Sequence, residues 1–137
     1  MLTAKKKMST KNQHAVTVMQ LIHEADTWKR LLEFIQVENV YLKNRLAEVT
    51  REVTDPGWLE QAEYFQNHFL AEDSAVSLLR RDVLDLESWL RREVIEDGAI
   101  IKEVRKKHKK LRADIELTEQ RFSRLKFEFN HYLSDKL

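Results

Sequence analysis

Carboxylate and histidine residues at helical spacing are the first candidates for chemistry, because together they can ligate a metal ion. His68 lies four residues before Glu72, and Glu128 lies three residues before His131. Carboxylate-bridged iron bundles use this Glu-x-x-His spacing, but they need two such motifs and two further glutamates that project inward from four helices. The chain has one such motif. We therefore interpret these histidines as surface or half-buried residues and predict no bound metal ion and no cofactor.

A basic run from Lys102 to Arg112 is the densest cluster of charge in the chain. Lysine and arginine on one helix face can bind a phosphate backbone without sequence specificity. No recognition module or aromatic stacking pattern accompanies the run. We favour a solvated face that Asp82, Asp85 and Glu87 partly neutralise. Binding of this run to nucleic acid is the alternative. The basic run consists of Lys102, Arg105, Lys106, Lys107, Lys109, Lys110 and Arg112.

Catalytic motifs are the next class to consider. The sequence offers no glycine-rich phosphate loop, no nucleophile motif and no pair of carboxylates in a recognisable cleft. Narrow helical bundles of this size seldom offer a substrate pocket. We therefore predict that the protein is not an enzyme.

Glycine and proline are scarce, since the chain of 137 residues has two glycines and one proline. These residue types form most chain reversals, so their scarcity indicates few and long elements. The length suits one domain with a real core. With 34% charged and 42% hydrophobic residues, the composition favours an all-α protein.

The formal net charge is +1, and the chain has no cysteine. A nearly neutral chain has no global field that would attract nucleic acid or a membrane surface. Without cysteine, disulfide scaffolds and thiolate zinc sites are excluded. No apolar core follows Lys5, Lys6 and Lys7, as a secretory signal would require. No run approaches the ~20 apolar residues of a membrane span. We predict a cytoplasmic protein without membrane contact.

Three stripes of mostly apolar residues, with steps that alternate between three and four, mark the helices that must position these groups. The first stripe is Val18, Leu21, Ala25, Trp28, Leu32, Ile35, Asn39, Leu42, Leu46, Val49 and Val53. The second is Trp58, Ala62, Phe65, Phe69, Glu72, Val76, Leu79, Val83, Leu86 and Leu90. The third is Ile101, Val104, His108, Leu111, Ile115, Thr118, Phe122, Leu125, Phe129 and Tyr132. No helix can bury such a stripe alone, so the stripes are expected to face one another.

A chain reversal at residues 54–57 pairs the first two stripes as an antiparallel hairpin. Asp55 suits the N-cap of the second helix, and Pro56 suits its first position. In this register Asn39 faces Glu72. Each of these residues is the interior polar exception of its own stripe, and their meeting in one layer is the best evidence for the hairpin.

The apolar spacing then fails at Glu93 and Asp97. Gly98 follows, and glycine is common just past a helix end. A second reversal near Asp97 pairs Leu90 with Val104. The predicted architecture is therefore an antiparallel up-down-up bundle of three long helices with coiled-coil-like packing.

Residues 1–12 are expected to form a flexible basic arm, and residues 13–137 a single three-helix bundle domain. One alternative remains. The stripe moves four residues from Asp97 to Ile101, a step that a continuous helix can absorb as a stutter. The second and third helices would then form one rod, and dimerisation would complete the helical hairpin.

Asn39, Glu72 and Thr118 are expected to form a buried polar layer near the middle of the bundle. A buried carboxylate is costly, so Glu72 must find a donor, take up a proton or lean out to solvent. The Asn39 side-chain amide can supply such a donor. We interpret the layer as a structural device that fixes register, with a ligand or ion site as the alternative. His108 lies opposite Leu86 and therefore lacks a second ligand.

Apolar residues also occur on the outer side of the first helix, where they are not needed for the core. Phe34, Val37 and Tyr41 are spaced three and four apart, and Val40 lies beside them. An outer aromatic row normally marks a contact surface. We therefore predict a helical interaction or scaffold protein that presents this face to a protein partner or to itself. A nucleic-acid-binding accessory protein and a metal- or ligand-binding bundle are the alternatives.

Overall fold

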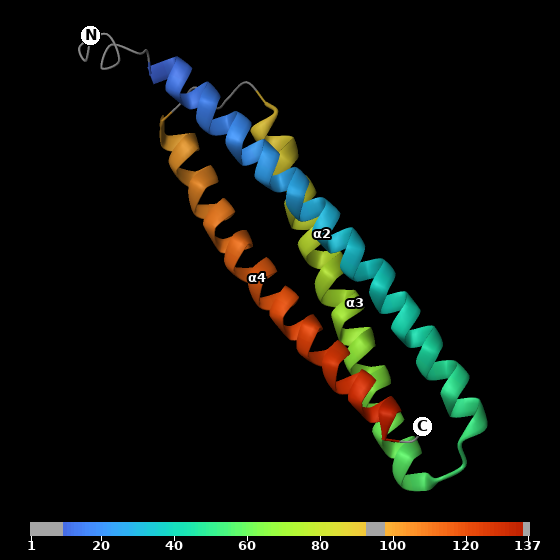
Figure 1. Ribbon diagram of the computed structural model, residues 1–137. Helices are drawn as coiled ribbons and strands as arrows, with labels where there is room; N and C mark the ends of the chain where they lie inside the picture. Colours follow the sequence, from blue (N-terminus) through green and yellow to red (C-terminus); the bar gives the residue numbers. More distant parts are fainter. Residues whose placement is uncertain (1–9, 93–97, 136–137) are drawn as a thin grey trace.

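Three long α-helices make up the computed structural model, which describes residues 10–92 and 98–135. Helix α2 spans Thr10–Glu52, α3 spans Pro56–Leu90 and α4 spans Gly98–Ser134. They lie side by side, with α3 running opposite to α2 and α4 (Figure 1). The predicted all-α, up-down-up bundle of three helices is confirmed. None of the described helices is long and apolar enough to cross a membrane.

The N-terminal boundary differs from the predicted one. Helix α2 begins at Thr10, so the last three residues of the predicted basic arm are helical. Residues 1–9 of that arm lie outside the described residues. The first position of the predicted stripe is Val18, eight residues after the start of α2.

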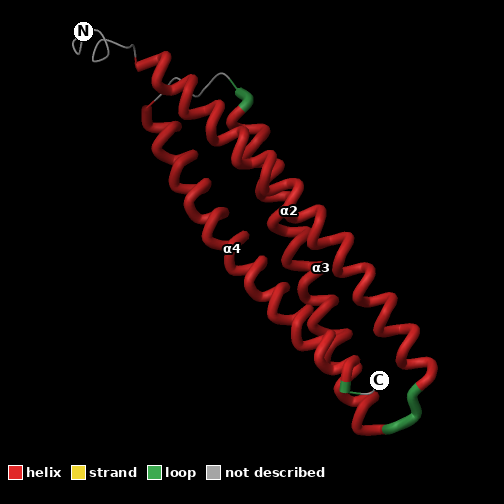
Figure 2. The backbone as a smooth tube through the Cα atoms, viewed as in Figure 1, coloured by secondary structure: helices red, strands yellow, loops and turns green. Residues whose placement is uncertain are grey.

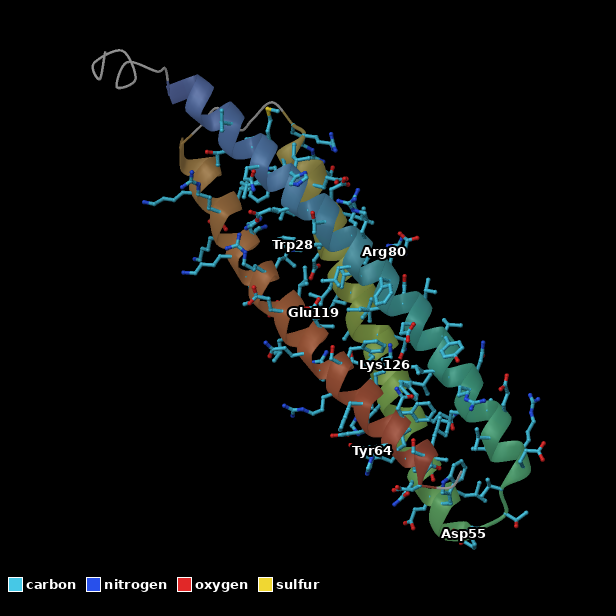
Figure 3. All side chains as sticks on the ribbon, viewed as in Figure 1. Trp28, Asp55, Tyr64, Arg80, Glu119 and Lys126 are labelled. Atoms are coloured by element: carbon cyan, nitrogen blue, oxygen red, sulfur yellow. The ribbon has the colours of Figure 1, made fainter. Side chains whose placement is uncertain are left out.

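The turn between α2 and α3 lies at the end of the bundle where Asp55 is labelled (Figures 2 and 3). Asp55 occupies the N-cap of α3 with extended backbone, and Pro56 is the first helical residue, as predicted. Proline suits this position because its fixed φ is helical and its missing N–H would have no partner there. The Leu59 backbone N–H donates to the Asp55 carbonyl oxygen at 3.0 Å. The sequence at this turn therefore ends one helix and starts the next.

Helix α3 ends at Leu90, before the failure of apolar spacing at Glu93 and Asp97. Arg91 and Arg92 follow in turn geometry, and their backbone N–H groups donate to the carbonyls of Glu87 and Trp89, each at 3.1 Å. The helix ends at the last apolar position of its predicted stripe. Asp97 lies outside the described residues, and α4 begins at Gly98. The alternative of one continuous rod is wrong, because α4 packs back along α3.

The core follows the three predicted stripes. Every stripe position of α3 is buried, as are those of α2 from Leu21 to Leu46. Val18 and Val49 are partly buried near the two ends of α2, and Val53 is partly buried just after its last residue. On α4 the buried stripe runs from Val104 to Tyr132, and Leu133 is buried beside it. The side chain of Ile101 is not among those described.

Polar side chains flank the α2–α3 core in a ladder with steps of seven residues. Lys29 Nζ lies 2.9 Å from Glu87 Oε2, and Arg80 Nη1 donates to Gln36 Oε1 at 3.0 Å. A slip of one heptad would place a lysine of α2 against Arg80, so the ladder opposes misaligned pairing. Pairs of this kind add little stability one by one. The ladder consists of Lys29–Glu87, Gln36–Arg80 and Lys43–Asp73.

A second ladder joins α2 to α4, which run in the same direction. Lys126 Nζ lies 2.7 Å from Glu38 Oε1, and Arg112 Nη2 donates to Glu24 Oε2 at 2.8 Å. The pairs are again separated by seven residues or a multiple of seven. This ladder consists of Thr17–Arg105, Glu24–Arg112 and Glu38–Lys126. The two ladders together fix the rotation and height of α2 relative to its neighbours.

Aromatic rings fill the core near the α2–α3 turn. The Trp58 and Tyr132 rings are stacked with centroids 4.5 Å apart, and Phe65 packs against Phe129 at 5.4 Å. The Tyr132 hydroxyl donates to the Trp58 carbonyl oxygen at 2.8 Å. Burial raises the pKa of Tyr132 to about 12, so this hydroxyl stays a neutral donor. The hydrogen bond ties the C-terminal end of α4 to the start of α3.

Replacing Tyr132 with Phe is expected to lower the free energy of unfolding by about 1 kcal/mol, because the buried hydrogen bond is lost while the ring remains. Urea denaturation of both proteins measures the difference. Tyr64→Phe is the matched control, since Tyr64 is an exposed tyrosine near the same end (Figure 3). Equal losses from the two changes would contradict a role for the Tyr132 hydrogen bond.

Candidate interaction surface

Phe34, Val37, Val40 and Tyr41 form the candidate surface, which we call the α2 patch. Their exposed fractions are 62%, 65%, 49% and 61%. All four side chains fall within two turns on the side of α2 opposite its buried stripe. The flanking stripe residues Ile35 and Leu42 are 2% exposed. Helix α2 is therefore apolar on both sides over this length.

Other exposed apolar side chains are more dispersed along the described helices. They are spread over the three helices, and scattered exposed apolar residues are normal for a protein surface. The α2 patch differs because four large side chains occupy neighbouring positions on one helix. The remaining exposed large apolar residues are Val16, Met19, Leu59, Tyr64, Leu70, Leu78, Leu84, Leu117 and Phe127.

Charged residues of opposite sign lie at the two ends of the α2 patch. Arg30 precedes Phe34 by one turn, and Glu48 follows Tyr41 by two turns on the same side of the helix. Both side chains are exposed. Within α2, Glu48 has a loose contact with Arg45 at 3.8 Å. Arg30 thus precedes the apolar side chains of this face, and Glu48 follows them.

Asn39, Glu72 and Thr118 are all buried, at 1%, 4% and 3% exposure. Asn39 lies behind the α2 patch, on the inner side of the same helix. Its Nδ2 donates to the Phe69 carbonyl oxygen at 2.9 Å and to Asp73 Oδ1 at 2.6 Å. Asp73 also pairs with Lys43 at the rim of the α2–α3 interface. The amide therefore links the core to one of the polar ladders.

The donor to Glu72 is not the one predicted. Arg121 Nε of α4 donates to Glu72 Oε1, and Arg121 Nη2 donates to Thr118 Oγ1 at 3.4 Å. The Arg121 side chain is half-exposed, so it reaches the buried carboxylate from the surface. The prediction that Asn39 supplies this donor was wrong, because the residue that donates to Glu72 does not lie on any of the three stripes. An arginine beside the stripe is long enough to enter the layer.

A second buried polar cluster joins α2 to α4, and the sequence pattern missed it. His108 is 4% exposed, and its Nε2 lies 2.6 Å from Glu24 Oε2. The Trp28 ring packs on the imidazole with centroids 4.5 Å apart. Arg112 binds the same Glu24 oxygen. Glu24 and Leu31 lie seven residues apart, at positions beside the first stripe. This spacing is the signal in the sequence that could have placed Glu24 at the interface between α2 and α4.

Burial lowers the pKa of His108 below its ordinary value of 6.5, although the nearby Glu24 carboxylate acts in the opposite direction. For Glu24, burial raises the pKa, but hydrogen bonds from Arg112 and Gln20 outweigh it and the net shift is downward. The pair therefore keeps a neutral imidazole beside an ionised carboxylate near neutral pH. The outer guanidinium of Arg112 compensates the carboxylate charge.

The basic run lies along the outer part of α4, and part of it is occupied by contacts within the bundle. Lys107 Nζ lies 4.7 Å from the centre of the Trp89 ring. Lys107 and Lys110 line a groove of about 290 Å³ together with Asp82 and Asp85, as the predicted neutralisation requires. Glu87 was also expected there, but it faces α2 and binds Lys29 instead.

The remaining members of the basic run differ in their contacts. Arg105 and Arg112 donate to Thr17 and Glu24 of α2. Lys102, Lys106 and Lys109 are exposed. Arg105, Lys107 and Arg112 thus make contacts within the bundle, although all seven side chains of the run are exposed.

The histidine and carboxylate spacings do not converge. Among the residues that the structure describes, no group of three or more His, Asp or Glu side chains could hold a metal ion. His68 is exposed and contacts the Tyr64 ring, whereas Glu72 is buried against Arg121. Glu128 is exposed near the aromatic end of the bundle.

Comparisons of the chain with protein families, characterised proteins and solved structures return no match. The function must therefore be argued from the residues and their contacts.

Replacing both Asn39 and Glu72 with Leu is expected to raise the melting temperature, because apolar side chains avoid the cost of burying a carboxylate. The helices should at the same time align less uniformly with one another along the bundle axis. Arg121→Ala is the matched control, and it should lower the melting temperature because Glu72 then stays buried without its cation. Thermal denaturation with sedimentation measures both effects. A lower melting temperature in the double variant would contradict a purely structural layer.

The pH dependence of stability provides a test of the His108 site. Because the folded pKa of His108 lies below its ordinary 6.5, the unfolded chain binds this proton at a higher pH than the folded chain does. The free energy of unfolding should therefore fall as the pH drops below about 6.5. Glu24 contributes only at lower pH, below its ordinary value of 4.5.

Urea denaturation at about pH 7.5 and about pH 5.5 measures this contribution. In His108→Leu the difference in unfolding free energy between the two pH values should shrink. His68→Gln, which changes an exposed histidine, should leave the difference as in the native chain. An unchanged pH dependence in His108→Leu would show that burial of this imidazole is not its cause.

Proposed function

We propose that the protein is a non-enzymatic helical interaction module that presents the α2 patch to a protein partner or to a second copy of itself. The observation that carries the proposal is the exposure of Phe34, Val37, Val40 and Tyr41 on a helix whose opposite side is already buried. The fold does not need these four side chains. A contact surface is the role that accounts for their type and their spacing.

The energetics of apolar side chains support a contact role. Full burial of one large apolar side chain gains about 1.5–3 kcal/mol relative to exposure. Two aromatic and two β-branched side chains on adjacent turns therefore offer a useful share of the free energy that a specific complex needs. Aromatic residues at the centre of an interface often dominate its affinity. Charged residues at both ends would form its polar rim.

The architecture supports rigid presentation of the surface. Stripe residues on the inner side of α2 pack against two other helices, and polar ladders fix its rotation. A partner would therefore meet a surface that is already ordered, and little conformational entropy would be lost on binding. We place this activity in a reducing compartment such as the cytoplasm, since the chain carries no cysteine.

A photo-crosslinking residue at position 37 tests the proposal in cells that express the chain. We expect covalent adducts at this position, because Val37 lies at the centre of the α2 patch. The matched control places the same residue at Gln120, an exposed position on α4. Gel electrophoresis and mass spectrometry identify the adducts.

Two variants establish whether the adducts depend on the patch. Tyr41→Asp should abolish them, because it introduces a charge into the apolar contact. Reversal of Lys106 and Lys107 to Glu should leave them in place. Circular dichroism checks that each variant is folded. Adducts of equal yield at positions 37 and 120, or adducts that survive Tyr41→Asp, would refute the proposal.

A further inference from the structure

We infer that the α2 patch binds a second copy of the same chain, with the two α2 helices antiparallel about a two-fold axis near Val40. This inference rests on the proposed function and names its partner. The observation behind it is the order of charges along the outer face of α2. Arg30 lies at one end of the patch and Glu48 at the other, and both are exposed.

Self-complementarity follows from this order. Residues 30, 34, 37, 41, 44 and 48 follow one another in steps of four and three, so they form one outer stripe. When two such stripes meet antiparallel, Arg30 of each copy faces Glu48 of the other. Val37 then faces Tyr41, and the axis passes at the level of position 39, so the Val40 residues of the two copies lie one position from it. Phe34 faces Asn44 in the same register, and two ion pairs enclose these contacts.

Other alignments of the two helices fit less well. A parallel pair would place Arg30 on Arg30 and Glu48 on Glu48, which is repulsive. An antiparallel pair with Val37 on the axis would place Glu48 against Asp26, again like charges. Among these arrangements, the two-fold axis near Val40 joins opposite charges and buries the patch together. A second copy is therefore the occupant that the surface itself specifies.

The contact is small but sufficient for a reversible dimer. Residues 30–48 span about five helical turns, or ~27 Å at 1.5 Å per residue. An interface of this length lies at the lower end of specific protein contacts. The buried stripe of α2 faces the opposite direction, so α3 and α4 of the two copies would lie on opposite sides of the α2 pair.

A single introduced cysteine tests the axis, and the absence of native cysteine makes the result unambiguous. Val40→Cys in the full chain should give a covalent dimer with a short bis-maleimide. Phe127→Cys is the control, because Phe127 is 72% exposed on α4 and lies away from the proposed contact. Dimers of equal yield from the two variants would overturn the proposed axis.

Charge exchange tests the antiparallel register by sedimentation equilibrium. The native chain should pass from monomer to dimer with increasing concentration. Arg30→Glu should weaken the dimer by about tenfold, since each copy loses an ion pair and gains a repulsion. Combining Arg30→Glu with Glu48→Arg should restore the native affinity to within about threefold. A thermal melt confirms that each variant is folded, and failure of the double exchange to restore affinity would overturn the register.

The outcomes also separate this inference from the proposed function. A chain that stays monomeric at high concentration overturns the self-association. If position 37 still gives patch-dependent adducts with a different protein, the interaction module stands and only the identity of its partner is wrong. If position 37 gives no adducts and the chain is monomeric, both proposals fail. A dimer that Tyr41→Asp leaves intact overturns the use of the α2 patch.

Discussion

The mutual burial of three narrow apolar stripes is the constraint on which the rest of this structure depends. The helices have 43, 35 and 37 residues, and outside their stripes they are mostly polar or charged. Helices of this kind gain most of their stability from packing rather than from intrinsic propensity. Each stripe must therefore face the same axis, and this fixes the rotation of every helix. The polar ladders follow, because they occupy the positions on either side of the stripes.

Alignment along the axis needs more than apolar contacts, since similar side chains recur every heptad. The buried layer around Asn39 and Glu72 supplies part of that specificity. Each of these side chains finds its partner at the rim of the bundle, in Asp73 or Arg121. A register slip would separate them and leave polar groups buried without partners, which is costly. The layer and the ladders therefore favour the same register by different mechanisms.

The sequence alone predicted the three helices, the turn at Asp55 and Pro56, and nearly all of the core, because heptad spacing is a strong and repeated signal. It predicted less well wherever a side chain reaches across an interface. Arg121 lies beside its stripe, so no stripe pattern placed it on Glu72. The contact between His108 and Glu24 depends on the offset between α2 and α4, which are far apart in the chain. Helix α3 ends at Leu90, the last apolar position of the second stripe, and the reversal predicted near Asp97 lies outside the described residues.

The α2 patch and the polar layer occupy the same two turns of one helix, and this coincidence links fold to function. Over this length α2 places Asn39 inward and four large apolar side chains outward. Ile35 and Leu42 remain buried on either side of Asn39, so the helix is apolar on both sides there. The inward rotation is held because the stripes on either side continue without a break, and because Asn39 and Lys43 bind α3. The four outward apolar side chains gain little from burial within the bundle. The proposed contact would bury this outer face, and it would account for the feature that the fold alone leaves unexplained.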